Sequence, residues 1–342
     1  MSRQKISFDD SLLKNVVESE KCLGCGACVV VCPLKCLEYI EEKPKLVKEC
    51  TSCGICAQIC PQFDWSLSSM ENFVFGRERG SDEEFGIYRK LVRARTTDSK
   101  ILEKCQDGGV VTALLTYALK NGLIEGAIVS GQTENKPLCP IPTLATNPME
   151  ILECAGTRYV YSPNIFSLAE AAKEKKVNIA FVGTPCQIRV VRKIQISGLK
   201  KYSNPIKVLI GLMCSECFTY SGLIKDHIKK KLGIDPEQVK KMNIKGRILV
   251  ETGSEVKTIS LAEAKQYVRE NCKPCKDFSS ELADISTGGL GLDGWTFTII
   301  RTKEGEELFS KAEKAGYIES RTLDKQVKAL DLLVKLSQRK RK

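Results

Sequence analysis

The sequence predicts a protein of mixed α+β and α/β class, in which a small cysteine-rich unit precedes a large α/β domain. Two observations support this division. Residues 22–60 contain two successive copies of one cysteine spacing, and from about residue 89 strand-length apolar runs alternate with helical patterns. A chain of 342 residues is long enough for both units. We therefore expect a first domain over residues 1–62, a linker over 63–88 and a second domain over 89–342.

The cysteine-rich unit is typical of a bacterial-type ferredoxin with two [4Fe-4S] clusters. Each copy reads C-x2-C-x2-C-x3-C-P, in which three cysteines bind one cluster and the fourth crosses to the other. Gly24, Gly26 and Gly54 allow tight turns between the ligands. A zinc site or a disulfide framework is the alternative, but zinc sites use four ligands and not eight in a doubled pattern. The predicted ligands are Cys22, Cys25, Cys28 and Cys60 for one cluster, and Cys50, Cys53, Cys56 and Cys32 for the other.

Composition and charge favour a protein of the cytoplasm without a membrane-spanning segment. Residues 1–20 are polar and lack an apolar leader segment, so the 17 cysteines indicate metal-bound thiolates in a reducing cytoplasm. No apolar run approaches the 18 residues that span a bilayer, although docking on the cytoplasmic face of a membrane partner stays open. The net charge is +11, but each cluster adds about two negative charges, so the basic balance does not indicate nucleic-acid binding. We interpret residues 339–342 as a frayed, solvated end rather than a lipid or nucleic-acid site.

The elements after the cysteine-rich unit follow in order. Residues 63–88 combine apolar anchors, such as Trp65, with a charged, glycine-spaced link, which favours a tether. Strand-length apolar runs that alternate with helical patterns then predict an α/β domain, with a Pro-rich passage at 137–148. The histidine of the sequence, His227, is expected on a solvated face of a lysine-rich helix. Strands are predicted at 91–94, 127–129, 179–182, 208–213 and 295–300, helices at 110–119, 166–175, 187–196 and 223–232, and a hairpin at 248–259.

Two glycine-rich stretches could approach a phosphate or a flavin. Gly289, Gly291 and Gly294 fit G-x-G-x-x-G, but the dinucleotide fingerprint requires a helix after it, and residues 295–300 read as a strand. We therefore do not expect a Rossmann fold. In residues 106–112 (QDGGVVT), the glycines begin a predicted helix, whose N–H groups and dipole favour a phosphate. The alternative is an N-cap made by Asp107.

Four further cysteines lie where a third cluster is plausible. Cys186 and Cys214 follow predicted strands, and strand ends at one edge of an α/β sheet are where sites gather. Cys272 and Cys275 form a C-x2-C pair, and four thiolates complete a cluster. The alternative is that Cys186 and Cys214 are ordinary buried cysteines. Cys217 competes with Cys214 as a ligand, and we interpret Cys36, Cys105, Cys139 and Cys154 as structural.

Four ordered motifs carry a resemblance to a known family: QDGGVVTALL at 106–115, GTPCQI at 183–188, GLMCSECF at 211–218 and CKPCKDFSSELADISTGGLG at 272–291. Over nearly all of residues 89–310, the chain resembles the family of beta subunits of coenzyme F420 hydrogenases and dehydrogenases. The resemblance implies FAD and a [4Fe-4S] cluster in the α/β domain, with Cys186, Cys214, Cys272 and Cys275 as cluster ligands. The FAD-binding residues that it implies are Gln106, Asp107, Gly108, Gly109, Val110, Thr112, Thr157, Arg158, Tyr159, Gly288 and Gly289.

The fused ferredoxin makes the chain most similar to the electron-input subunits of archaeal dehydrogenases of reduced coenzyme F420, which serve methanogenesis. That similarity implies an enzyme that oxidises reduced coenzyme F420 by hydride transfer to FAD. Single electrons would then pass through three [4Fe-4S] clusters to a complex-I-like membrane dehydrogenase, which reduces methanophenazine or quinone, or to soluble ferredoxin. A hydride donor gives two electrons and each cluster accepts one, so a flavin is needed between them. No acid/base pair is required, and we assign no catalytic residue.

Two alternatives stay open. The chain could be a non-catalytic electron-transfer subunit of a hydrogenase or formate dehydrogenase. It could also be a flavin reductase that uses NAD(P)H, or an enzyme that reduces sulfite or glutamate precursors, although a valid dinucleotide fingerprint is missing.

Overall fold

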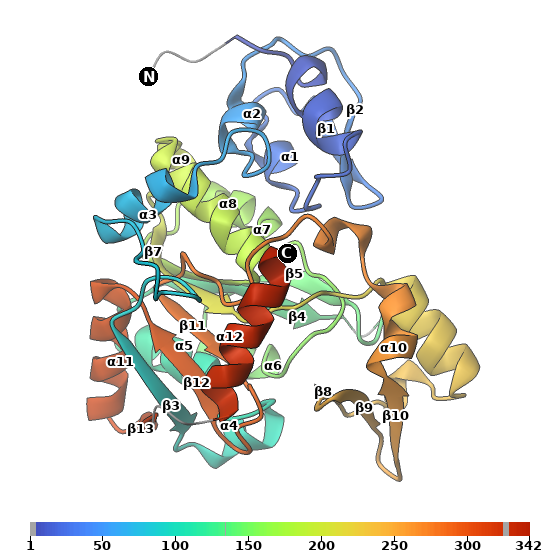
Figure 1. Cartoon of the computed structure of the whole chain (residues 1–342), viewed down its shortest axis with the longest axis vertical. Helices are drawn as coiled ribbons and strands as arrows, with labels where there is room; N and C mark the ends of the chain where they lie inside the picture. The colour runs from blue at the N-terminus through green and yellow to red at the C-terminus, as the bar shows by residue number, and fades with distance from the viewer. Residues whose placement is uncertain (1–4, 134, 324–327) are drawn as a thin grey trace.

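The computed structural model describes residues 5–133, 135–323 and 328–342, and shows a small N-terminal unit stacked on a larger body built around one sheet (Figure 1). Gly26 and Gly54 precede two short helices of this unit with φ of 78° and 69°, a left-handed conformation that glycine adopts without strain. Cys28 and Cys56 therefore fall in the first turn of a helix. The elements of the unit are the π-helix η1 (Asp9–Val17), α1 (Ala27–Val31), α2 (Ile55–Ile59) and the hairpin of β1 (Leu37–Ile40) and β2 (Lys43–Leu46).

The larger body contains an eight-stranded mixed sheet in the order β13-β3-β12-β11-β7-β6-β4-β5. The inner strands β4, β6, β7 and β11 are parallel, and antiparallel strands flank them on both sides. Since helices cover both faces, β6 is buried along its whole length. The strands are β3 (Lys90–Thr96), β4 (Gly126–Gln132), β5 (Pro140–Ala145), β6 (Ile179–Gly183), β7 (Ile206–Leu212), β11 (Ile285–Gly288), β12 (Thr296–Ile300) and β13 (Ile318–Thr322).

Each face of the sheet has its own apolar core. One face packs on α4 (Ser99–Lys104), α5 (Val110–Lys120), α6 (Pro148–Glu153) and α11 (Lys303–Lys314). The other packs on α7 (Phe166–Lys173), α8 (Pro185–Ile196) and α9 (Lys200–Ser203), and this core continues into the N-terminal unit through Ala27, Val31, Ile55 and Ile59. Apolar burial therefore docks the N-terminal unit on the body. In the parts of the chain that the structure describes, no helix has the length and apolar character needed to cross a bilayer.

Most of the predicted elements are present. The strands at 91–94, 127–129, 179–182, 208–213 and 295–300 are confirmed, as are the helices at 110–119, 166–175 and 187–196. The predicted hairpin is confirmed as β9 (Arg247–Glu251) with β10 (Val256–Ser260). The Pro-rich passage contains β5, which the sequence did not predict. Proline fits there because β5 is the edge strand of the sheet, where a missing N–H on the outer side costs no hydrogen bond.

A lobe at the side of the body corrects the expectation for His227 (Figure 1). It consists of the π-helix η2 (Tyr220–Lys231), the three-stranded sheet of β8 (Lys241–Ile244), β9 and β10, and α10 (Leu261–Ala264). The His227 side chain is 1% exposed and stands edge-on to the Tyr267 ring, so the prediction of a solvated face is wrong. In η2 the Leu232 N–H donates to the His227 carbonyl five residues back, and this wider turn changes which positions face the lobe core.

The C-terminal end is also ordered, contrary to the predicted frayed tail. It forms α12 (Lys328–Arg341), which crosses the front of the body in Figure 1. The Lys340 amine donates to the carbonyls of Ser215, at 2.5 Å, and of Cys272, at 3.2 Å, and Arg341 pairs with Glu281 at 2.5 Å. These contacts hold the basic end on the body, so it is not a free solvated end.

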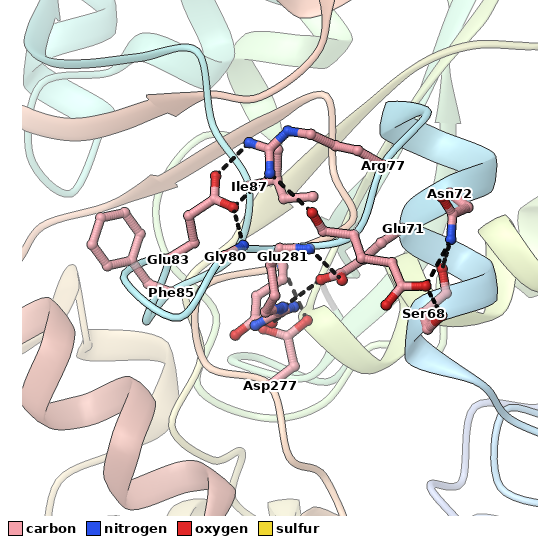
Figure 2. Close-up of polar contacts among 12 residues, drawn as sticks. Ser68, Glu71, Asn72, Arg77, Gly80, Glu83, Phe85, Ile87, Asp277 and Glu281 are labelled. Atoms are coloured by element: carbon pink, nitrogen blue, oxygen red, sulfur yellow. Dashed lines mark hydrogen bonds and ion pairs between the residues drawn. The ribbon is translucent and has the colours of Figure 1, made fainter.

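Residues 63–88 lie packed against the body (Figure 2). Within them, α3 (Leu67–Phe75) carries Glu71, which shares Arg79 with Glu281 of the body. The buried Arg301 donates to the carbonyls of Ile87, at 2.8 Å, and Phe85, at 3.1 Å. Because these bonds satisfy carbonyls that lie away from water, Arg301 anchors the end of the segment.

We expect Arg301→Met to destabilise the protein by about 3–5 kcal/mol, because the change leaves the buried carbonyls of Ile87, Phe85 and Ser279 without their donor and removes a buried positive charge near Glu281. Denaturant unfolding of anaerobically prepared, cluster-loaded protein, followed by circular dichroism, measures the loss. Arg89→Met is the matched control: the Arg89–Glu306 pair is exposed, so it should cost less than about 1 kcal/mol. Equal, small losses in the two variants would contradict the anchoring role.

Candidate functional site

The structure brings the eight cysteines of the N-terminal unit into two sets of four. Set A is Cys22, Cys25, Cys28 and Cys60, and set B is Cys32, Cys50, Cys53 and Cys56; within each set, the thiols influence one another electrostatically. The four sulfur-bearing residues of set B also line one small cavity beside Phe8. Burial raises the pKa of Cys60 to about 11 and of Cys56 to about 12, so thiolates there require a compensating metal. Soft sulfur donors in such sets fit iron–sulfur clusters.

A third group of cysteines, set C, gathers at the carboxyl ends of β6 and β7. It is Cys186, Cys214, Cys217, Cys272 and Cys275. Cys186 lies in the first turn of α8, where Thr184 and Gln187 form a capping box and the Thr184 hydroxyl is 3.1 Å from the Cys186 sulfur. Strand ends on one edge of a parallel sheet bring together residues that are distant in the sequence.

Cys217 lies inside set C and not beside it. Its sulfur is 3.9 Å from the Cys214 sulfur, and its N–H donates to the Cys272 sulfur at 3.3 Å. Five thiols therefore surround a site for which a cluster needs four. Within the described residues, no three His, Cys, Asp or Glu side chains converge on a single metal ion. Sulfur donors in this number suit a site for a soft metal, and a [4Fe-4S] cluster there would use four of the five.

Set C faces set A across the junction of the two units. Cys186 is close enough to Cys25 for their thiols to influence each other. Around them, Asn271 donates to the Cys22 carbonyl at 3.0 Å, and Gln62 donates to the Pro274 carbonyl at 3.4 Å. Cys28 of set A also has Cys56 of set B as an electrostatic neighbour, so set A adjoins both set C and set B.

The glycines at the start of α5 have a packing role. A Cβ on Gly108 would lie 2.5 Å from the Ala94 carbonyl oxygen, and Gly109 has a φ of 68° as the N-cap of α5. The neighbouring protein atoms and the local backbone conformation therefore exclude a larger side chain at both positions. Val110 and Thr112, on the first turn of α5, are buried, and Val110 belongs to the apolar core. These residues position the preceding loop, and the sequence pattern alone did not separate that role from phosphate binding.

Other residues of the expected FAD region meet around Asp107. A Cβ on Gly289 would lie 2.5 Å from the Asp107 carboxylate, so only glycine allows this approach. Burial raises the pKa of Asp107, while Lys245 and Lys241 oppose the shift. Burial also raises the pKa of Tyr159, and Asp107 adds to that shift. The two lysines come from the side lobe, and no sequence motif marked them.

Two buried donors near this point have no protein partner among the described residues: Gln106 Nε2 and Arg158 Nε. Arg158 Nη1 donates to the carbonyls of Ala155 and Gly156, both at 3.1 Å. A Cβ on Gly156 would lie 3.2 Å from the Lys104 carbonyl, so the loops that carry the two donors are adjacent. Unmatched donors of this kind fit a polar or anionic ligand such as the pyrophosphate of FAD. Thr157, in the same loop, is exposed.

The FAD region also adjoins set C. Gly288 ends β11, and a Cβ there would lie 2.6 Å from the sulfur of Met213, the residue before Cys214. The loop after Gly288 joins β11 to the antiparallel strand β12 and leads to no helix. The glycine loop thus lies beside the end of β7 that carries set C.

Three models of known protein families match parts of this chain. Two family models describe the N-terminal and C-terminal parts of the coenzyme F420 hydrogenase/dehydrogenase beta subunit. Residues 91–169 match the N-terminal model, and residues 177–326 match the C-terminal model. Residues 14–71 match the model "4Fe-4S dicluster domain".

Individual relatives cover different parts of the chain. The beta subunit of the coenzyme F420 hydrogenase of Methanothermobacter thermautotrophicus is 40% identical over 75% of this chain and 92% of its own length. The F subunit of the F(420)H(2) dehydrogenase of Methanosarcina mazei is 30% identical over 96% of this chain and 92% of its own. A chain of the F420-reducing [NiFe] hydrogenase complex from Methanosarcina barkeri has a similar structure, with a TM-score of 0.73 and 38% identity over 77% of this chain and 92% of that one.

Replacement of set C cysteines should remove iron selectively. We expect Cys275→Ala to lower the iron content by about one cluster of three, because a cluster needs all four thiolates. Cys154→Ala, away from the sets, should keep its iron. Parallel analysis of Cys214→Ala and Cys217→Ala identifies the fourth ligand as the one whose loss lowers iron. Unchanged iron in Cys275→Ala would remove Cys275 from the ligands.

Gly289→Ala should weaken flavin binding by roughly tenfold, or ~1.4 kcal/mol, because its methyl group would displace the Asp107 carboxylate. Flavin released from anaerobically purified protein measures the change. Gly253→Ala is the control, since its Cβ would meet only the flexible end of Lys240 at 3.3 Å. Equal flavin content in the two variants would exclude the loop from the flavin site.

Proposed function

The chain belongs to the family of coenzyme F420 hydrogenase/dehydrogenase beta subunits, which transfer electrons in F420-linked oxidoreductases, and we propose that it oxidises reduced coenzyme F420. Its electrons would leave one at a time through set C, set A and set B. The observation that carries this proposal is the contact of set C with both neighbours: Met213 and Cys214 adjoin the Gly288–Gly289 loop, and Cys186 adjoins Cys25.

The residues that would hold FAD are those with unmatched polar groups or close backbone approaches. Gln106 and Arg158 supply buried donors, and Gly289 and Asp107 shape the adjoining loop. FAD bound there would supply the exchange between a two-electron hydride donor and one-electron clusters. The task of the protein is to orient the donor, and the two side-lobe lysines beside Asp107 suit an anionic substrate such as a phosphorylated deazaflavin.

Residues at the junction would keep water out of the route between set C and set A. Tyr161 is buried with Cys186 and Cys25 as neighbours, and its hydroxyl is 3.4 Å from Gln187 Nε2. Tyr39 packs edge-on against Phe166 and donates to the Gly24 carbonyl at 2.6 Å. A dry, packed junction fixes the separation of the two clusters and strengthens the electrostatic effect of each on the other.

Electrons would leave from set B, at the far side of the N-terminal unit. The apolar Leu34, 52% exposed, follows Cys32 and Pro33 beside the set B cavity. An exposed apolar side chain at a cluster suits a transient redox contact. We propose as partners a complex-I-like membrane dehydrogenase, which would reduce methanophenazine or quinone, or soluble ferredoxin. The M. mazei relative, matched over nearly the whole chain, supports the first of these.

A second candidate function is a relay without its own substrate. The observation in its favour is that close contacts with other protein atoms are enough to explain why residues 108 and 109 are glycines, so these glycines are not evidence of a ligand-binding loop. In that case the body would only dock the N-terminal unit on a hydrogenase or formate dehydrogenase.

The test is anaerobic stopped-flow spectroscopy of protein reconstituted with FAD, iron and sulfide. We expect reduced coenzyme F420 to bleach the flavin band and then the broad cluster absorbance, with viologen reduced in turnover. NADH is the parallel donor and should bleach neither. A protein that retains no flavin and leaves reduced coenzyme F420 unoxidised would establish the relay, and bleaching by NADH alone would establish a nicotinamide-linked reductase.

A further inference from the structure

Arg269 is a buried cation at the junction of the two units. Its side chain is 1% exposed, and its guanidinium lies 3.7 Å from the centre of the Tyr161 ring. Its Nε donates to Glu42 of the N-terminal unit at 2.6 Å, and its backbone N–H donates to the Cys217 carbonyl at 3.0 Å. The residue therefore links the β1–β2 hairpin region to set C.

The guanidinium lies between set A and set C. On one side, a Cβ on Gly24 would be 2.7 Å from Arg269 Nη2, so the group lies against the loop between Cys22 and Cys25. On the other side, the guanidinium lies against the Tyr161 ring, which is buried beside Cys186, and the backbone carbonyl of Arg269 accepts from the Cys272 N–H at 2.9 Å. One positive charge thus acts on both cysteine sets.

The protein neutralises this charge only in part. Among the described residues, Nη2 is buried without a hydrogen-bond partner, although a guanidinium carries five N–H donors. The Glu42 side chain is 37% exposed, so water screens its charge more than that of Arg269. A buried cation with an unmatched donor is costly unless further negative charge lies close by. Reduced iron–sulfur clusters in sets A and C would provide that charge.

We propose that Arg269 is a positioning residue for electron transfer, which raises the reduction potentials of the clusters in set A and set C together. The proposal rests on the proposed function, because it requires clusters in both sets. Each reduction adds one electron to a cluster, and a fixed positive charge in a dry site lowers the free energy of the reduced form. Since the same charge faces both clusters, we expect both potentials to rise. The contacts of Arg269 lie with the surroundings of sets A and C, so set B should respond little.

The experiment compares Arg269→Gln with Glu42→Gln by EPR-monitored redox titration of the loaded full-length protein. Both changes break the same ion pair, but one removes the positive charge and the other the negative charge. We expect Arg269→Gln to lower the equilibrium constant for reduction of two clusters roughly tenfold, which lowers their reduction potentials by about 59 mV for a one-electron step. Glu42→Gln should raise the same two potentials. The third cluster is the internal control and should not move. Arg269→Lys should restore most of the shift, because it keeps the charge.

Shifts of the same sign in the two variants, or none, would show that the pair only docks the units and would overturn the proposal. If Arg269→Gln loses a cluster on purification, Glu42→Gln still decides, because its potential must rise. Failure of the proposed function has a different result: the three clusters titrate as expected in these variants, but the unchanged protein does not oxidise reduced coenzyme F420.

Discussion

The junction between the Cys22–Cys25 loop and residues 269–271 is the constraint on which the rest of the structure depends. A continuous apolar core, shared by α1, α2, α7 and α8, removes this junction from water. Burial makes free thiolates there unfavourable, so the cysteines would need a bound metal or nearby cations to be stable in charged form. The contacts of Arg269 and Asn271 across the junction are a consequence of that requirement.

The topology of the sheet determines where the candidate site lies. Parallel strands β6 and β7 end at one edge, and the loops that follow them carry Cys186 and Cys214 to the same place. The opposite edge is used for stability: Arg192 pairs with Asp284 at 2.7 Å, and Asp284 also accepts from the Leu209 N–H at 2.7 Å. This division leaves the cofactor edge free to vary in its loops without loss of the core.

Basic side chains lie close to the cysteine sets that we propose as cluster ligands. Lys340 of α12 reaches the Cys272 carbonyl and opposes the pKa shift that burial causes in Cys275. Arg269 does the same for Cys186 from the other side. Basic groups of a chain with a net charge of +11 therefore lie where thiolates and reduced clusters would place negative charge.

The sequence by itself determined the local features, and only the tertiary structure decided the long-range contacts. The doubled cysteine spacing predicted the dicluster unit, and alternating apolar patterns predicted most strands and several helices, because both depend on neighbours in the chain. Four motifs indicated the family, which the comparisons confirmed.

The sequence did not predict β11, β13 or α11, whose patterns are short or interrupted by polar residues that the fold buries. Lys340 and His227 were expected in solvent. The packing of α12 brings Lys340 onto the Cys272 carbonyl, and the π-helical turn of η2 places His227 in the interior of the side lobe. Arg269 carries no motif, and its role depends on Glu42, more than two hundred residues away, with which it pairs at 2.6 Å. Such pairs depend on how the two units dock. Docking is driven by the burial of apolar surface from many elements together, so no local sequence pattern predicts it.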